Sequence, residues 1–388
     1  MTRRLGFKNL WVDAICIIQD SEADKIAEIN AMGEIYANSA LTILAGSAAS
    51  SKDGFVGEAP LPPLLSENGE FSCMIPFKFP DEQIKALHLT RNEIDIPGGY
   101  DLDPLSSRAW TLQEWLLSTR KLSFSNLGVY WDCLSKFTDL LAPHEEGDGW
   151  VPRLRMPSQF HHDDNDPEKL SWQEESRDPG RFWIELIEEY SRRKLSVLED
   201  RLPAISGLAA EVQVWVKNSK AYRAGLWEEH LIEHLGWCLE GQASRTKKLD
   251  GPSWSWVSVL ASVGFDPIRY SSALLIKCST TLVSENAPLG PVSGGRLVLQ
   301  AYLARPPPMT IDDIRSTYPA ATHQFDIDYA EDPSDTTKIP YAFLLLGLTG
   351  LKQIVGLLLR RLEDQEDEIY MRVGLITVYD EKDKTANA

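Results

Sequence analysis

The sequence has few cysteines and few basic residues, and both shortages narrow the class of protein. Its 388 residues include five cysteines (Cys16, Cys73, Cys133, Cys238 and Cys278), widely spaced and without a C-x-x-C pair. This pattern is typical of a reducing compartment and argues against a disulfide scaffold or a cysteine-rich zinc site. Lysine and arginine number 39 against 57 aspartate and glutamate residues, so the formal net charge is −18. A general nucleic-acid binder is therefore not expected.

The sequence also lacks an uninterrupted membrane span. The apolar run Leu10 to Ile18 contains Asp13 and is not followed at once by a small-residue cleavage site, which argues against a signal peptide. Residues 342–359 are apolar over the length of a short span, but Lys352 and Gln353 interrupt them, so two strands of a hairpin are predicted. We expect a soluble cytoplasmic protein with no membrane span.

Phosphate-loop, dinucleotide-binding and G-x-S-x-G signatures are absent, and one catalytic pattern is present. His230, Glu233 and His234 form H-x-x-E-H, in which two histidines would bind Zn²⁺ and the glutamate would activate water, as in a zinc peptidase. The alternative is an amphipathic helix over residues 225–236 whose polar face carries the histidines. We favour the helix, because no third ligand is evident, and we predict no metal site.

Strand and helix periodicities alternate in the first 45 residues. Residues 10–18 are β-branched and aromatic, which predicts a buried strand. Apolar residues recur at three- and four-residue steps over 22–38, which predicts a helix, and residues 40–45 predict a second strand. This βαβ unit has parallel strands and a right-handed crossover, and it places the N-terminal domain in the α/β class. A helix over 106–118 and a strand over 128–133 complete it.

The remaining sequence divides by pattern into three further regions. We assign residues 1–135 to the α/β domain, 136–180 to an acidic insertion or linker, 181–250 to a helical region and 251–388 to a β-rich C-terminal region. The acidic run 363–368 is predicted to be a turn. The expected helices are 181–194, 204–217 and 225–236, and the expected strands are 253–259, 273–278, 296–303, 341–348, 353–361 and 370–379.

Three kinds of side chain are candidates for chemistry, each with a structural alternative. Asp13 lies among apolar residues, where it is either a pocket acid or a structural hydrogen-bonding group, and Arg108 is its expected partner. Glu28 falls near the edge of the buried helix face, where most glutamates are solvated. Trp254 and Trp256 alternate with serines, so both indoles share one strand face as core residues or as a stacking platform.

Seven segments resemble one family. LWVDAICIIQD (10–20), residues 27–55 and SSRAWTLQEWLLSTRKLSF (106–124) resemble the fungal heterokaryon incompatibility (HET) domain. Residues 200–209, 222–237, 252–259 and 370–378 resemble the C-terminal part of large HET-domain proteins. The residues that match family motifs are Trp11, Asp13, Cys16, Asp20, Arg108, Trp110, Gln113 and Glu114.

This resemblance implies a fungal protein of non-self recognition and regulated cell death, an intracellular signalling or effector module that contacts other proteins or its own copies. Family members begin with an upstream strand and an LSY-x-WG type motif, so we expect an N-terminally truncated HET domain. The resemblance implies no cofactor, and an enzyme is the less favoured expectation.

A more distant resemblance connects HET domains with Toll/interleukin-receptor (TIR) domains, some of which cleave NAD⁺ with a helical glutamate. Glu28, followed by Ile29, matches that glutamate, and Lys25 stands where those domains carry an aromatic residue. If NAD⁺ is a substrate, Glu28 is the implied catalytic residue: it would bind the ribose hydroxyls and stabilise the positive charge that develops as nicotinamide leaves.

Overall fold

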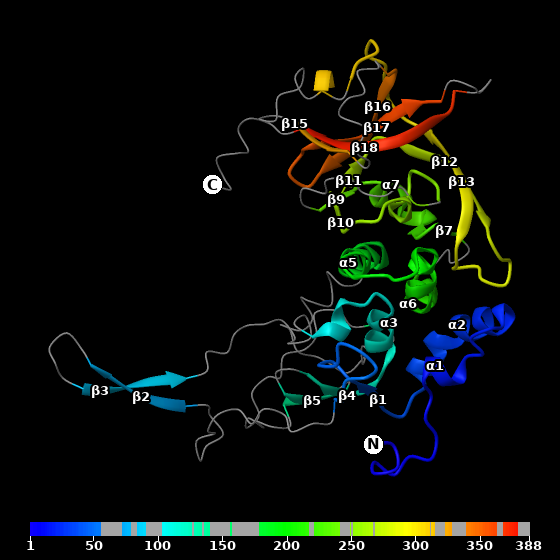
Figure 1. Cartoon of the computed structure of the whole chain (residues 1–388). Helices are drawn as coiled ribbons and strands as arrows, with labels where there is room; N and C mark the ends of the chain where they lie inside the picture. The colour runs from blue at the N-terminus through cyan, green and yellow to red at the C-terminus, as the bar shows by residue number, and fades with distance from the viewer. Residues whose placement is uncertain are drawn as a thin grey trace. The chain divides into compact units, whose positions relative to one another are not determined.

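The chain forms two compact units, which are described separately. The computed structural model describes residues 1–55, 72–78, 84–90, 103–125, 128–133, 136–139, 156, 178–216, 221–240, 249, 251–266, 268–310, 312–314, 323–327, 339–362 and 368–378 (Figure 1). One unit contains Met1–Asn30 and Asp163–Ala388, and the other contains Ala31–His162. Helix α2 (Glu22–Ala37) crosses the boundary between them.

The unit Ala31–His162 is built on a small mixed sheet of order β1-β4-β5-β6. Its strands are β1 (Thr42–Leu44), β4 (Arg120–Phe124), β5 (Val129–Cys133) and β6 (Lys136–Asp139). β1 and β4 are parallel, and the other two pairs are antiparallel. The connection from β1 to β4 contains the antiparallel pair β2 (Ser72–Lys78) and β3 (Ile84–Thr90), the 3-10 turn η2 (Pro104–Ser107) and helix α3 (Trp110–Leu117).

The predicted strand over residues 10–18 is wrong. Asp13–Cys16 form the one-turn helix α1, and Ile15 is 80% exposed. The Asp13 carboxylate accepts the N–H of Ala14 at 2.7 Å, a local bond that competes with strand formation. The predicted helix over 22–38 is confirmed as α2, and the strand over 40–45 contains β1. The predicted βαβ unit is therefore not formed, and the parallel partner of β1 is β4.

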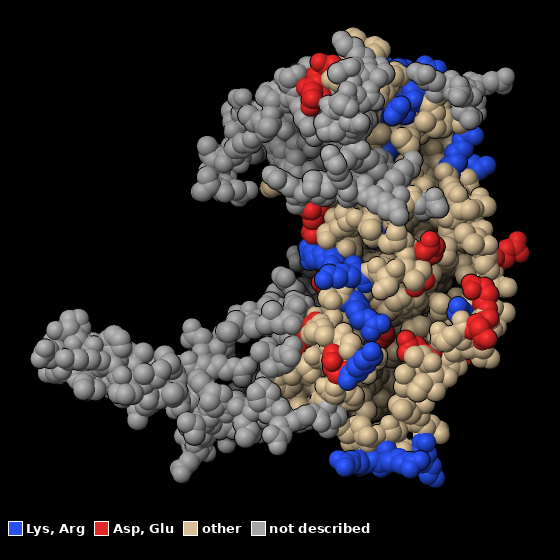
Figure 2. Space-filling view, in the orientation of Figure 1, with Lys and Arg blue, Asp and Glu red and all other residues tan. Residues whose placement is uncertain are grey.

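The segment before α1 gathers basic side chains. Arg3, Arg4 and Lys8 are exposed, and Figure 2 shows blue residues together at the foot of the molecule, where Figure 1 marks the N-terminus. Arg3 and Arg4 lie in a turn closed by a hydrogen bond from the N–H of Phe7 to the carbonyl of Thr2 at 3.1 Å, and Lys8 follows this turn. The N-terminal segment is therefore locally basic, although the net charge of the chain is −18.

The helical part of the other unit contains α5 (Pro179–Ser191) and α6 (Pro203–Trp215), with the 3-10 turn η4 (Leu198–Arg201) between them. Both predicted helices are confirmed. The Asp178 carboxylate caps α5 by accepting the N–H of Gly180 at 2.9 Å, and proline at the first helical position starts each helix. Helix α5 buries one side, with Phe182, Trp183, Leu186, Ile187 and Tyr190 in the core.

The predicted helix over 225–236 is wrong for most of its length. Its place is taken by β7 (Tyr222–Arg223), β8 (Leu226–Trp227), the 3-10 turn η5 (Glu228–His230), the one-turn helix α7 (Leu231–His234) and β9 (Trp237–Leu239). Ala224 and Gly225 have φ angles of 49° and 88°, which make a tight turn between β7 and β8 and are incompatible with a right-handed helix.

The C-terminal half is β-rich. Its main sheet has the order β11-β16-β17-β18-β15, with β14 paired to β16. The predicted hairpin over 342–359 is confirmed as the antiparallel pair β16–β17, and the strand over 370–379 as β18. One face of the sheet buries a core that includes Ile314, Tyr341 and Leu358. The strands are β11 (Ile268–Ser271), β14 (Leu303–Ala304), β15 (His323–Ile327), β16 (Tyr341–Thr349), β17 (Ile354–Arg361) and β18 (Tyr370–Val378).

Two smaller antiparallel pairs accompany this sheet. β9 pairs with β10 (Val263–Phe265), and β12 (Leu274–Leu282) pairs with β13 (Val292–Gln300) as a long two-stranded ribbon (Figure 1). The predicted strand 273–278 overlaps β12, and the predicted strand 296–303 overlaps β13 up to Gln300, whereas Leu303 begins β14. The predicted strand 253–259 is wrong, because the Ser255 hydroxyl accepts the N–H of Val257 at 3.3 Å and caps the 3-10 turn η6 (Trp256–Ser258).

The architecture is thus mixed α/β with a β-rich C-terminal half. Most of the acidic region 136–180, and residues 363–367 of the predicted acidic turn, lie outside the described residues. Within the described part of the chain, no helix has the length and apolarity needed to span a membrane.

Candidate functional site

A buried ion pair lies on the central strands of the unit Ala31–His162. Lys121 on β4 and Asp132 on β5 are 7% and 2% exposed, and their Nζ and Oδ2 atoms are 3.0 Å apart. Lys121 also donates to the carbonyl of Ser118 at 3.2 Å, and its ammonium lies 5.0 Å from the centre of the Trp115 ring. These partners compensate the loss of hydration of a buried cation. The ion pair therefore joins α3 to two strands.

A second buried contact joins α3 to β1. The hydroxyls of Thr42 and Ser118 are 2.7 Å apart, and Ser118 donates to the carbonyl of Glu114 at 2.6 Å. The Thr42 hydroxyl also lies 2.9 Å from that of Ser39, which donates to the carbonyl of Tyr36 at 2.9 Å. Thr42 and Ser118 are both buried. The polar groups at the C-terminal end of α3 are hydrogen-bonded to one another, which indicates a structural role for them.

A glycine and a buried acid lie together at the carboxyl ends of the parallel strands β1 and β4. The N–H of Ser47 bonds to the carbonyl of Phe124 at 2.9 Å, and Asp103 is buried beside Gly46. A Cβ at position 46 would overlap the Asp103 carboxylate and lie 3.0 Å from the Phe124 carbonyl oxygen. Glycine is therefore required there. In open α/β sheets, the carboxyl edge of parallel strands is the usual place for a ligand. Gly46, Ser47 and Asp103 form what we name the carboxyl-edge site.

Four of the predicted motif residues lie on or beside α3. Gln113 is buried, Trp110 and Glu114 are partly buried, and Arg108 is exposed at the end of η2. α3 therefore brings these residues into one short segment, as their spacing predicted. Asp103, which is the buried acid of this region, was not predicted. Its sequence signal was an Asp-Pro step directly before the 3-10 turn η2.

The other motif residues lie in the N-terminal segment. Trp11 is partly buried, whereas Asp13, Cys16 and Asp20 are exposed, and the thiol of Cys16 accepts the N–H of Val12 at 3.5 Å. The prediction of a buried Asp13 is wrong, since the residue begins an exposed helix. Asp13 and Arg108 belong to different units, so their pairing stays a prediction.

Glu28, the predicted catalytic residue, lies on α2 and is half-buried. Among the described residues, its carboxylate makes no hydrogen bond or ion pair. NAD⁺ cleavage by Glu28 stays a prediction.

Residues 1–114 match the family model described as "Heterokaryon incompatibility protein (HET)". The chain carries a HET domain. The match ends within α3, so it includes the carboxyl-edge site and the motif residues but not Lys121 or Asp132. Neither curated proteins nor solved structures gave a match to the chain.

Outside the HET match, the H-x-x-E-H pattern forms no zinc site. His234 is fully buried; its Nε2 bonds to the carbonyl of Gly180 at 3.1 Å, and its Nδ1 accepts the N–H of Trp227 at 3.4 Å. Burial lowers the pKa of His234 to about 3. A hydrogen bond to Glu233 raises the pKa of His230. Because both nitrogens of His234 are occupied, it has no lone pair for a metal, and the described residues contain no cluster of metal-ligating side chains.

Five tryptophans of the unit that contains Asp163–Ala388 are buried in its core: Trp183, Trp227, Trp237, Trp254 and Trp256. The carbonyl of Gly225 accepts the indole N–H groups of Trp183 at 2.8 Å and Trp256 at 3.1 Å. Arg372 on β18 stacks 3.6 Å above the Trp237 ring and donates to the carbonyls of Leu235 and Trp237. Trp254 and Trp256 are buried, so the core interpretation of this pair is confirmed and the stacking platform is wrong.

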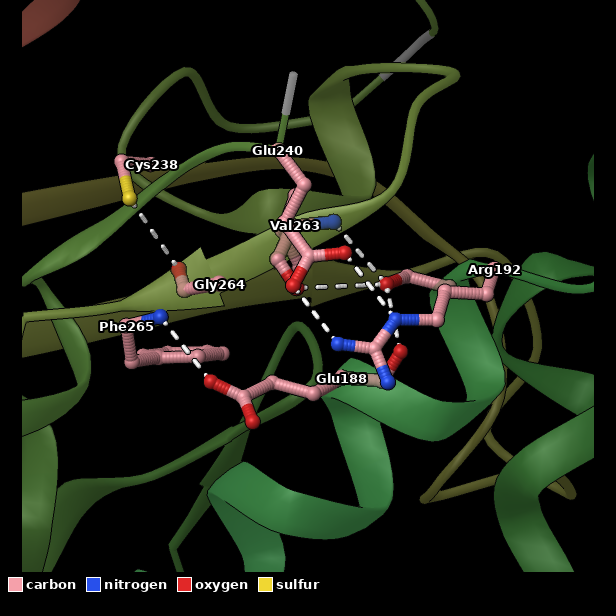
Figure 3. A network of polar contacts seen from close by, with 8 residues as sticks. Glu188, Arg192, Cys238, Glu240, Val263, Gly264 and Phe265 are labelled. Atoms are coloured by element: carbon pink, nitrogen blue, oxygen red, sulfur yellow. Dashed lines mark hydrogen bonds and ion pairs between the residues drawn. The ribbon is translucent and has the colours of Figure 1, made fainter. Parts of the chain in front are cut away.

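A polar network connects α5 with β9 and β10 (Figure 3). Glu188 accepts the N–H of Phe265 at 3.0 Å, and Arg192 forms a two-point ion pair with Glu240, with bonds of 2.7 and 3.0 Å. Burial raises the pKa of Glu188, and Glu240 adds a smaller effect in the same direction. Figure 3 shows the Glu188 carboxylate pointing toward the N–H of Phe265 on β10 and the Glu240 carboxylate pointing toward Arg192 on α5. The network fixes the helix to this pair and includes one acid with a perturbed pKa.

Proposed function

We propose that the protein acts in heterokaryon incompatibility as a signalling or effector module of regulated cell death, through contacts with other proteins. The HET match over residues 1–114 carries this proposal. The hydrogen bonds that join Thr42 on β1 to Ser118 at the C-terminal end of α3 support the proposal, because they favour a rigid scaffold for an interaction surface.

We place the functional centre of this HET domain at the carboxyl-edge site. Asp103 is a buried carboxylate beside a glycine that cannot accept a side chain, and both lie where two parallel strands end. Both residues lie at the edge where open α/β sheets usually bind ligands, which supports a role in recognition.

The test expresses the full chain from an inducible promoter in a filamentous fungus and measures hyphal growth and uptake of a vital dye. We expect the unaltered chain to stop growth and the Asp103→Asn variant, which keeps the shape of the side chain, to permit it. Gly46→Ala should behave like Asp103→Asn because its methyl group displaces the carboxylate. Gly54→Ala is the matched control, since a Cβ at position 54 has no neighbour within 4 Å.

Thermal unfolding of the purified variants distinguishes lost function from lost folding. The Asp103→Asn chain should melt close to the unaltered chain. Growth arrest that is equally strong in Asp103→Asn and in the unaltered chain would exclude the carboxyl-edge site. An unaltered chain that accumulates without slowing growth would overturn the proposed function.

A further inference from the structure

The main sheet of the C-terminal half has an apolar hollow on one face, which we name the sheet hollow. It has a volume of about 370 Å³, and its lining comes from β16, β17, β18 and residues 302–304, which include β14. Figure 1 shows β16, β17 and β18 side by side, and β14 pairs with the other edge of β16. Four neighbouring strands span about 14 Å, because strands lie about 4.8 Å apart. The sheet hollow is therefore long and runs across the strands.

A glycine in the middle of β17 leaves the gap that forms the sheet hollow. The register places Leu345, Gly356 and Ile376 in one row across β16, β17 and β18, so the centre of this row has no side chain. A Cβ at position 356 would lie 2.8 Å from the carbonyl oxygen of Leu344. This close approach of another backbone accounts for the glycine. The gap is therefore built into the sheet and does not depend on the rotation of a side chain.

The sheet hollow has a packed floor and an exposed margin. Ile376 is buried and belongs to the core that includes Tyr341 and Leu358, so the floor is part of a packed layer. At the margin, Tyr302 is 76% and Ile354 is 44% exposed. Exposed apolar side chains around a hollow mark binding grooves, and sites for small molecules have volumes of about 300–1,000 Å³. The sheet hollow fits this description of a ligand site.

The charge and the size of the sheet hollow indicate the class of ligand. Among the described residues that line it, none is charged, and their side chains are apolar apart from the Tyr302 hydroxyl. A charged group would lose its hydration there without gaining a partner. The volume equals that of about twelve water molecules, and a methylene group is about as large as one of them. An unbranched chain of about ten carbons therefore fits the volume and the length.

We propose that the sheet hollow binds the alkyl chain of a neutral lipid that is free in solution, with the polar head of the lipid near the Tyr302 hydroxyl. A fatty-acid carboxylate is a poorer match, because no cation lines the described part of the site. An apolar side chain of a partner protein would occupy only a fraction of the volume. The site lies outside residues 1–114, so the proposal is independent of the carboxyl-edge site.

The experiment uses the full chain and N-phenyl-1-naphthylamine, a neutral apolar probe that becomes fluorescent in apolar surroundings. We expect the chain to raise the fluorescence of the probe and 1-decanol to displace it. 1-Octanol should bind about fifteenfold more weakly than 1-decanol, because each buried methylene contributes a factor of about four. Decanoate should also bind more weakly, since its carboxylate finds no cation. Equal affinity for octanol and decanol would overturn the proposal.

Two variants locate the site. Ala304→Trp places an indole in the sheet hollow from an exposed position and should lose binding of both the probe and decanol. Ala23→Trp is the matched control, since Ala23 is an exposed alanine on α2. Ile354→Asn needs no extra space and should bind decanol about fivefold more weakly, because it removes apolar surface. Leu351→Asn is its control, at a residue that is 64% exposed and does not line the site.

Thermal unfolding of each variant separates a lost site from a lost fold. If Ala304→Trp unfolds early, the comparison of Ile354→Asn with Leu351→Asn decides the proposal. Decanol affinities that are equal within each variant and control pair would overturn it. A chain that sediments with phosphatidylcholine vesicles, and that free decanol does not release, would assign the site to a membrane lipid and overturn the assignment to a free one.

Discussion

Gly225 holds the aromatic core together, and its replacement by alanine gives a sharp test of the structure. Its φ angle of 88° is in the left-handed region, and an added Cβ would lie 2.8 Å from Nε1 of Trp256. The left-handed conformation costs a residue other than glycine about 1–2 kcal/mol. The clash also displaces the carbonyl that accepts two buried indole N–H groups, each bond contributing about 1 kcal/mol.

The sum is a loss of about 3–4 kcal/mol in the free energy of unfolding, a large share of the roughly 5–15 kcal/mol of a typical domain. Urea unfolding followed by tryptophan fluorescence measures it, because unfolding exposes the buried indoles of this unit, Trp183 and Trp256 among them. Gly294→Ala is the control, since a Cβ there has no neighbour within 4 Å. A Gly225→Ala chain whose midpoint equals that of Gly294→Ala would refute the proposed role of this turn.

Three further predictions concern the buried His234, the buried ion pair of Lys121 with Asp132, and Glu28. The pKa of His234 is lowered to about 3, so stability is complete above the unfolded value of 6.5 and falls as the pH decreases from 6.5 toward 3, by about 1.4 kcal/mol per pH unit. Denaturant titrations at pH 6.5 and 5 should therefore give a steeper loss for the unaltered chain than for His234→Gln, and equal slopes would contradict the assignment. Lys121→Met should lower the free energy of unfolding by about 3–5 kcal/mol, because it leaves Asp132 buried without a cation. The double variant Lys121→Met, Asp132→Leu should recover most of this loss in the same denaturant titration. A double variant as unstable as Lys121→Met would show that the unpaired carboxylate does not cause the loss. If the HET domain cleaves NAD⁺, Glu28→Ala should abolish nicotinamide release by the purified chain, and undiminished release would exclude this residue.

Long periodic segments were predicted well from the sequence. α2, α5, α6 and β16–β18 form where their sustained patterns predict them, and the buried side of α5 follows from its pattern, whereas Met32 is the one buried residue of α2. The failures have local causes. Residues 10–18 have strand composition, but a strand needs a neighbour, and the Asp13 carboxylate bonds locally instead. Residues 225–236 have helical spacing, but the positive φ angles at Ala224 and Gly225 begin a strand turn.

The candidate site was harder to predict because it depends on long-range pairing. The parallel pairing of β1 and β4 joins Thr42 to Lys121, and no local pattern indicates that register. Asp103 becomes notable only when this pairing places it beside Gly46. The α3 motif residues could be found, since they are neighbours in sequence. Their exposure, such as that of Arg108 compared with Gln113, required the fold.

The stacking of Arg372 on Trp237 has a consequence for synthesis of the chain. The guanidinium bonds to two carbonyls that lie 137 and 135 residues earlier in the sequence, at Leu235 and Trp237. The residues of the aromatic core are therefore synthesised well before Arg372, whose side chain completes that core. During that interval the partly built core has to be protected by chaperones or remain loosely packed. A premature stop codon before β18 would leave this state permanent, and such products should be removed by proteolysis.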